Sequence, residues 1–187
     1  MTNNGSRHES AFGMDADAGL EAMGAVQVGA LGLATRYEIE CYDRDGNLKW
    51  SEDVHNLVTN EGLNDALSKY FKGSSYSASF FVGLKGTGTG AAGDTLASHA
   101  GWTEVSGYTG NRQALVLGAV SGQSVDNTAS KAEFPITGAA TVAGAFLATI
   151  ATGTGGTLYG VADFTTARTV ENGDTLRVSV TLTAASA

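Results

Sequence analysis

The chain has 187 residues, of which 26 are glycine and one is proline, and its 11 basic and 19 acidic side chains give a formal net charge of -8. This length predicts one domain with a sizeable core. The scarcity of proline excludes collagen and proline-rich linkers, and the acidic balance argues against a nucleic-acid partner, which would need clustered Lys and Arg. The single cysteine excludes an intramolecular disulfide framework and a cysteine-based zinc site.

Residues 1–34 are predicted to form a flexible or extended N-terminal arm, and residues 35–187 a single β-sandwich domain. The apolar stretch Ala22 to Ala34 is similar to the core of a signal peptide, but it follows acidic residues where a secretory signal needs basic ones. It is also too short to cross roughly 30 Å of hydrocarbon, so we expect no membrane span. A merely disordered tail is the alternative to an arm that becomes ordered against a partner.

Residues 37–54 predict a β-hairpin. Tyr37, Ile39 and Cys41 alternate with polar residues, as one buried face of a strand requires. Asp45-Gly46 is typical of a tight hairpin turn. Residues 48–54 then return as the partner strand, with Leu48 and Trp50 on a common face. Cys41 is expected to be a small buried hydrophobe.

A helix is predicted over residues 60–72. Thr59 can cap its first turn, Glu61 suits that turn electrostatically, and Gly73 supplies a stop. The apolar residues recur at i, i+3, i+4, i+7 and i+8, which predicts one buried stripe. This stripe consists of Leu63, Ala66, Leu67, Tyr70 and Phe71.

The rest of the chain predicts short strands separated by glycine-rich turns, with a helical turn at Asp94–His99. The expected strands are Ser77–Leu84, Arg112–Leu117, Ala132–Ile136, Thr141–Ile150, Thr157–Asp163 and Thr175–Thr183. The last of these follows the turn signal Asn172-Gly173, and its apolar and polar residues alternate most regularly. Such strands favour a mainly β fold, an antiparallel β-sandwich of jelly-roll or Ig-like type, with the one amphipathic helix at an end or edge.

Two loops carry residues that could suggest a bound ion. Gly86–Gly90 is glycine-rich, but a phosphate loop needs a following Gly-Lys-Ser/Thr, and Asp94 arrives instead. Asp43–Asn47 contains calcium-type ligands, but in EF-hand spacing Leu48 stands where Gly is required and Val54 where Glu is required. We expect a flexible loop and a hairpin turn, and therefore no metal site and no cofactor.

The sequence predicts no catalytic residue, so we expect that the protein is not an enzyme. Asp94, Ser98 and His99 are the residue types of a hydrolytic triad, but no Gly-x-Ser-x-Gly nucleophile elbow accompanies them. Glu38 and Glu40 could form a glycosidase pair, yet two acids on a solvent-facing strand are far more often simply solvated.

Four segments together carry a resemblance to a known class of protein. They are Asn56–Asn64, Ala92–Glu104, Gly156–Tyr159 and Gly173–Val178, followed by an alternating strand. In these segments the chain resembles the small β-rich virion structural proteins of tailed bacteriophages. Within that class, its short single domain is most similar to a capsid decoration (cement) protein. The resemblance carries no catalytic motif.

The resemblance implies a protein made in the host cytoplasm that binds the major capsid protein at the capsid surface and stabilises the shell. Copies are expected to associate as a dimer or trimer, without a nucleic-acid or membrane partner. The apolar arm residues Val26, Val28, Leu31 and Leu33 are the expected partner contacts. The alternative is a tail or head fibre module that recognises cell-surface carbohydrate. Its ligand surface would be Trp102, Glu104, Tyr108 and Arg112.

Overall fold

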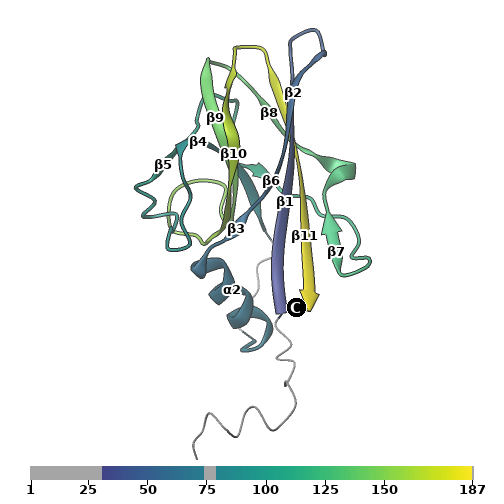
Figure 1. Ribbon diagram of the computed structural model, residues 1–187, viewed down its shortest axis with the longest axis vertical. Helices are drawn as coiled ribbons and strands as arrows, with labels where there is room; N and C mark the ends of the chain where they lie inside the picture. Colours follow the sequence, from purple (N-terminus) through teal and green to yellow (C-terminus); the bar gives the residue numbers. More distant parts are fainter. Residues whose placement is uncertain (1–30, 74–78, 187) are drawn as a thin grey trace, which may run out of the picture.

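The computed structural model describes residues 31–73 and 79–186. They form two antiparallel sheets, one against the other, with a helix at one end (Figure 1). The predicted fold, a mainly β antiparallel sandwich with one amphipathic helix, is confirmed. Residues 1–30 lie outside the described residues, so the expected extended arm stays a prediction there. Within the described ranges no helix is long and apolar enough to cross a membrane.

The first sheet has the strand order β2-β1-β11-β7, with β8 also paired to β11. These strands are β1 (Leu31–Tyr42), β2 (Leu48–His55), β7 (Ser124–Asp126), β8 (Ala132–Pro135) and β11 (Thr175–Ser186). The second sheet has the order β3-β10-β9-β4-β5, with β6 paired to β4. Its strands are β3 (Leu57–Val58), β4 (Phe81–Gly88), β5 (Trp102–Glu104), β6 (Gln113–Ala114), β9 (Ala140–Ala148) and β10 (Leu158–Val170). The helix is α2 (Asn60–Tyr70), and a short 3₁₀ turn, η1 (Thr128–Ser130), precedes β8.

The observed strands differ from the predicted ones mainly at their ends. β1 begins at Leu31, so the last residues of the predicted arm belong to the sandwich. β4 starts four residues later than predicted, β6 keeps only two residues of its expected strand, and β10 continues to Val170. Pairing partners decide these limits, because a strand persists only where a neighbour accepts its backbone hydrogen bonds.

The main core lies between the two sheets. From the first sheet it takes the alternating residues of β1 and β11, including Tyr37, Ile39, Leu176, Val178 and Val180, all fully buried. Strands β4 and β9 of the second sheet supply the opposite layer, with Val82, Leu84, Ala145 and Leu147. The inward-facing residues predicted for the first and last strands, β1 and β11, are therefore confirmed.

A smaller core covers the outer face of the second sheet. It contains Leu96, Trp102, Phe146, Ala148, Leu158 and Val161. The segment between β4 and β5 folds over β9 to make this layer, so β9 is buried on both faces. The helical turn predicted at Asp94–His99 is wrong. This segment instead forms tight turns joined by a bridge between Thr95 and Ser98, which lets Leu96 reach the sheet.

The β1–β2 hairpin is present, but its loop is longer than a tight two-residue turn. Asp43 C=O accepts from Gly46 N–H at 3.0 Å, and Gly46 has φ = 84°, which only glycine adopts without strain. A bulge then shifts the register between Cys41 and Tyr42. This one-residue slip turns Leu48 to solvent, 55% exposed, so its predicted common face with Trp50 is wrong.

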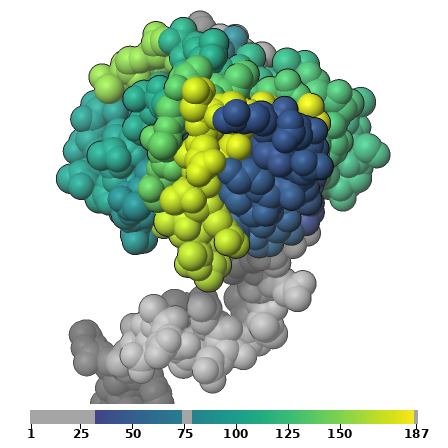
Figure 2. Space-filling model, turned by 90° about the horizontal axis from the view of Figure 1, so that it is seen from above, coloured from purple at the N-terminus to yellow at the C-terminus, as the bar shows by residue number. Residues whose placement is uncertain are grey.

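The hairpin lies beside the β10–β11 turn, as the view onto this end of the molecule shows (Figure 2). Lys49 Nζ pairs with the buried carboxylate of Asp174 at 2.7 Å, and Arg44 donates to the carbonyl of Asn172 at 3.4 Å. The turn predicted at Asn172-Gly173 is confirmed, with Gly173 at φ = 96°. Both turns at this end are thus tied together by charged groups.

Helix α2 is capped as predicted. The Thr59 hydroxyl accepts from Gly62 N–H at 3.0 Å, and the Glu61 carboxylate accepts from Leu158 N–H at 2.8 Å on the edge of β10. Gly62 is the helix residue that approaches the sheet most closely, since a Cβ there would lie 2.2 Å from the carbonyl oxygen of Tyr159. A glycine is therefore required for the helix to dock on β10.

We predict that Gly62→Ala destabilises the protein by about 1–3 kcal/mol, because the new methyl group must push α2 away from the β10 backbone. In an unconstrained helix the same change would stabilise by about 1 kcal/mol, so the sign of the effect is diagnostic. Urea denaturation measures it. The control is Asn64→Ala, at an exposed position of the same helix, which should be neutral or slightly stabilising. Equal effects of the two changes would contradict the close contact.

A second prediction concerns stability at alkaline pH. Burial raises the pKa of the Cys41 thiol from 9.0 to about 11, and the nearby Asp174 carboxylate acts in the same direction. Because the folded pKa is the higher one, the stabilisation is complete below pH 9 and is lost as the pH rises towards 11.

Wild type should therefore lose up to about 1.4 kcal/mol per pH unit more than Cys41→Ala across this window. Urea midpoints measured in steps from pH 7 to about pH 10.5 test this, and the variant serves as the control for all other titrating groups. Parallel profiles for the two proteins would show that Cys41 does not titrate differently on unfolding.

Candidate functional site

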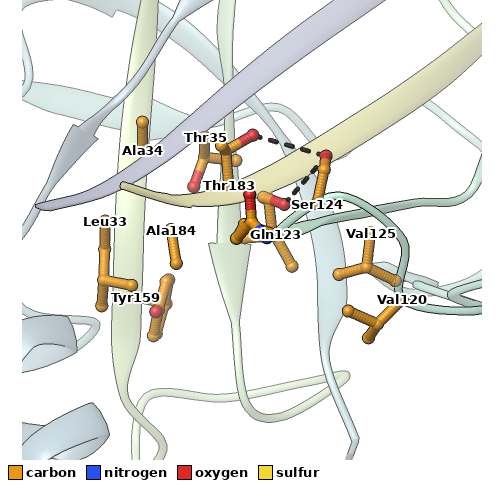
Figure 3. A pocket seen from close by; sticks show the side chains of 11 residues that line it. Leu33, Ala34, Thr35, Val120, Gln123, Ser124, Val125, Tyr159, Thr183 and Ala184 are labelled. Carbon is orange, nitrogen blue, oxygen red and sulfur yellow. Dashed lines mark hydrogen bonds between the residues drawn. The ribbon is translucent and has the colours of Figure 1, made fainter. Parts of the chain in front are cut away.

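An apolar groove opens at the end of the sandwich where β1 begins (Figure 3). Its volume is about 290 Å³, and strands β1, β7, β10 and β11 and the turn before β7 contribute to its walls. The lining residues are Leu33, Ala34, Thr35, Val120, Gln123, Ser124, Val125, Tyr159, Leu182, Thr183 and Ala184. The groove exists because β1 and β11 extend beyond the second sheet at this end, so their inner face lacks a full opposite layer (Figure 1).

Few polar groups face this groove. The hydroxyl of Thr35 is buried and has no hydrogen-bond partner. Ser124 donates to the carbonyl of Leu182 at 3.3 Å. Gln123 occupies the turn before β7 with φ = 60°, a conformation that is costly for a residue with a side chain. Such a surface can bind apolar side chains but offers little to a charged ligand.

Helix α2 places its apolar residues on the outside, so the predicted buried stripe is wrong. The exposed fractions are 41% for Leu63, 54% for Leu67, 81% for Tyr70 and 66% for Phe71. The less exposed side of α2 carries buried Gly62 and the half-buried residues Glu61, Asp65, Ala66, Ser68 and Lys69, so Ala66 is the one member of the predicted stripe on that side. The amphipathic pattern is real, but the sheet has packed against its polar side.

Tyr159 of β10 contacts both the groove and helix α2. Its side chain lines the groove and packs edge-to-face on Phe80 with ring centroids 5.4 Å apart, and its backbone carbonyl lies against Gly62 of the helix. Gly62 is on the buried side of α2, so the helix meets Tyr159 through that side, and its exposed apolar residues point away from this contact.

The residues predicted as partner contacts fall mostly outside the part of the chain that the structure describes. Val26 and Val28 lie in residues 1–30. Leu31 is the first residue of β1, and Leu33 is half-buried in the wall of the groove. Leu33 thus lies on an open apolar surface, while the contacts predicted for Val26 and Val28 stay untested.

Three of the four residues predicted as a carbohydrate surface gather around Phe146. Arg112 makes two hydrogen bonds to Glu104, of 2.9 and 2.7 Å, and its guanidinium lies 5.2 Å from the Phe146 ring centroid. Trp102 packs on the same ring at 5.2 Å. Tyr108 lies apart in the main core, where burial and the charge of Glu104 raise its pKa to about 12.

These aromatic rings are not exposed. Trp102 is 4% and Tyr108 is 7% exposed, and Arg112 is committed to Glu104 and to two loop carbonyls, of Ile150 and Gly153. A sugar platform needs an accessible ring face, which neither Trp102 nor Tyr108 supplies. Carbohydrate binding by this group stays a prediction without structural support.

The glycine-rich segment Gly86–Gly90 is built around a buried cation, and the flexible loop predicted there is wrong for its first three residues, which end strand β4. Lys85 is fully buried, and its ammonium group hydrogen-bonds to the carbonyls of Gly86 and Gly88 and lies 2.8 Å from an Asp163 carboxylate oxygen. The other carboxylate oxygen of Asp163 accepts from Gly90 N–H at 3.0 Å. Carbonyls at the end of β4 thus point inward at a lysine, whereas a phosphate loop must point N–H groups at an anion.

Lys85 was not singled out by the sequence, and no local pattern marks it. Its side chain crosses over β9 at Gly144, where a Cβ would come within 3.3 Å of the Lys85 Cδ. A side chain at position 144 would clash most severely with the carbonyl oxygen of Ala162, at 2.0 Å, and would also crowd the Lys85 side chain, so the glycine on β9 leaves room for the lysine on β4 to reach the aspartate on β10. The remaining Asp163 oxygen has no hydrogen-bond partner other than this ion-pair contact.

The residue types of a hydrolytic triad do not assemble into one. Asp94 accepts from the indole N–H of Trp102 at 2.8 Å, and the His99 ring stacks on Trp102 and places Nδ1 3.1 Å from its carbonyl oxygen. Ser98 is part of the turn bridged to Thr95. Asp94 and His99 therefore fix the indole ring rather than activate a nucleophile.

The acidic candidates are also engaged. The Asp43 carboxylate accepts from the backbone N–H groups of Asn47 and Asp45, at 2.8 and 2.9 Å. These hydrogen bonds close the hairpin loop and lower the pKa of Asp43. Glu38 pairs with Arg36, and Glu40 with Lys131, whose hydrogen bond lowers the Glu40 pKa. Among the described residues, no group of three or more His, Cys, Asp or Glu could hold a metal ion.

Comparison with known proteins gives one family. The family model described as podophage GP4 fiber I protein gp80 matches residues 58–185, which include α2 and most of both sheets. No curated protein matches the chain. The family match confirms the resemblance to phage virion structural proteins that residues 56–64, 92–104, 156–159 and 173–178 carry.

We predict that Lys85→Met destabilises the protein by about 2–4 kcal/mol, because the change leaves a buried carboxylate oxygen and two carbonyls without a partner. The matched control is Lys131→Met, which removes the half-exposed pair with Glu40 and should cost about 0–1 kcal/mol. Thermal or urea denaturation compares them. Similar losses for both variants would mean that the buried position of Lys85 is unimportant for stability.

Proposed function

The chain belongs to the family of podophage GP4 fiber I protein gp80, and on this ground we propose that it is a structural subunit of a phage fibre. The family match over residues 58–185 carries the proposal, because the family is named for a fibre protein. A phage virion structural protein is located in the virion. What the proposal adds is the position in the particle.

The shape of the described domain supports a role in protein contact rather than catalysis. At one end an apolar groove, lined by residues such as Leu33, Val120 and Leu182, is open to solvent. The polar residues that could suggest chemistry, Asp94, His99 and Lys85, are each used to hold the fold. We therefore propose that the protein is not an enzyme and acts by binding other virion subunits, including further copies of itself.

The other possible role within the virion is that of a capsid decoration protein on the capsid surface. The short single domain favoured this role at the level of the sequence, and a decoration protein would require the major capsid protein as its partner. The fibre has the additional support of the family name. Carbohydrate recognition by Trp102 or Tyr108 is not included in the proposed role, because both rings are buried.

The copy number in purified virions separates the two positions. Isotope-labelled peptides of this chain and of the major capsid protein, quantified in the same digest, give the ratio of the two proteins. A fibre subunit should be present at a small fraction of the capsid protein, and gold-labelled antibody should decorate fibres in electron micrographs. A ratio near that of the capsid protein, with label over the head, would show decoration instead.

A further inference from the structure

The inverted orientation of α2 needs an explanation. An amphipathic helix gains most by burying its apolar side, at about 25 cal/mol per Å² removed from water. Here Leu67, Tyr70 and Phe71 are all more than half exposed, while Gly62 is buried against β10. Contiguous exposed apolar residues on one side of an element mark a binding surface. Something else is therefore expected to cover this side of the helix.

We propose that the apolar side of α2 is the docking surface for residues 22–30 of the same chain. The described chain begins at Leu31, and Figure 1 shows the start of β1 and helix α2 at the same end of the sandwich. Leu33 and Ala34 line the groove at this end, together with Tyr159, whose backbone contacts the helix at Gly62. Residues just before Leu31 therefore start at the end of the sandwich that carries the uncovered surface.

The composition and length of this segment fit the surface. Residues 22–30 read AMGAVQVGA, with one polar residue, Gln27, and no charge. Nine extended residues reach about 30 Å, whereas the eleven residues of α2 extend only about 16 Å. The segment can therefore leave β1, turn, and still cover the full length of the helix with Val26 and Val28.

A tethered segment fits this surface better than a second copy of the chain. Stable interfaces between separate proteins bury at least about 1,200 Å² in total, or about 600 Å² on each partner, and one side of a three-turn helix offers less than that share. A covalently attached segment needs no such area, because its effective concentration is in the millimolar range. The exposed area on α2 thus suits an intramolecular partner.

Photo-crosslinking of the purified full chain tests this contact. Tyr70, 81% exposed, is replaced by p-benzoylphenylalanine, a ring of similar shape, and the crosslinked peptide is identified by mass spectrometry. We expect crosslinks within the monomer to residues 20–30. The control carries the same probe at Leu48, 55% exposed in the hairpin at the opposite end, where this product should be absent. Crosslinked dimers, or crosslinks elsewhere in the chain, would overturn the proposal.

A second variant pair keeps the test independent of the probe. Val26→Asp with Val28→Asp should lower the yield of the crosslink from position 70 by at least about tenfold, because ionised carboxylates cannot be buried against an apolar surface. Asn3→Asp with Ser6→Asp adds the same charge outside the segment and should leave the yield unchanged. An unchanged yield with both pairs would contradict docking by residues 22–30.

Both measurements use the isolated protein, so they do not depend on the proposed fibre role. Circular dichroism and thermal unfolding of each variant establish that the sandwich is intact before the yields are compared. The virion copy number can therefore disprove the fibre while the α2 contact stands, and the crosslinking result can disprove the contact while the fibre stands.

Discussion

The pairing of β1 with β11 is the interaction on which the rest of the structure depends. It runs without interruption from Leu31 opposite Ser186 to Tyr42 opposite Thr175, and so joins the two ends of the described chain. Its register places Tyr37, Ile39, Val178 and Val180 on one inner face, and a slip by one residue would turn all of them outward. Strands β2, β7 and β8 all attach to this pair. Between β7 and β8, Asn127 continues the ladder with its side chain, donating to Val178 C=O and accepting from Val180 N–H.

The same pair also creates the open end of the molecule. Because β1 and β11 extend beyond the second sheet at this end, their inner surface continues past the core as the groove around Leu33, Leu182 and Tyr159 (Figure 1). Helix α2 packs on β10 of the second sheet through Gly62 and leaves Leu67 and Tyr70 exposed to solvent. Apolar surface is thus concentrated at one end of the domain, in the groove and on α2. The aspartate and histidine of the candidate triad are used elsewhere, where they hold an indole ring in place.

How much the sequence could predict is clearest from individual elements. The alternation in β1 and β11, the Thr59 cap and the turn at Gly173 were predictable, because each depends on neighbours in the chain. The face of β2 on which Leu48 lies was not predictable, because a bulge decides it. The limits of β4 and β6 were not predictable either, because the available pairing partners decide them. Lys85 and Asp163, far apart in sequence, meet across Gly144, and no local pattern predicts such a pair. Trp102 and Tyr108 were predicted as part of a ligand surface under the carbohydrate alternative, and only the fold showed that both rings are buried.

By itself, the sequence determined that an amphipathic helix starts at residue 60, predicted over residues 60–72 and observed over Asn60–Tyr70, that the domain is mainly β, and that the chain resembles phage virion proteins. Hydrophobic periodicity specifies which residues share a face, and turn residues specify where strands must stop. Only the tertiary structure decided which side of α2 meets the sheet and where an apolar surface stays open. The physical reason is that periodicity states that one side of a helix avoids water, but it does not state which partner covers that side. In this protein the close approach of Gly62 to β10 fixes the helix with its apolar side outward.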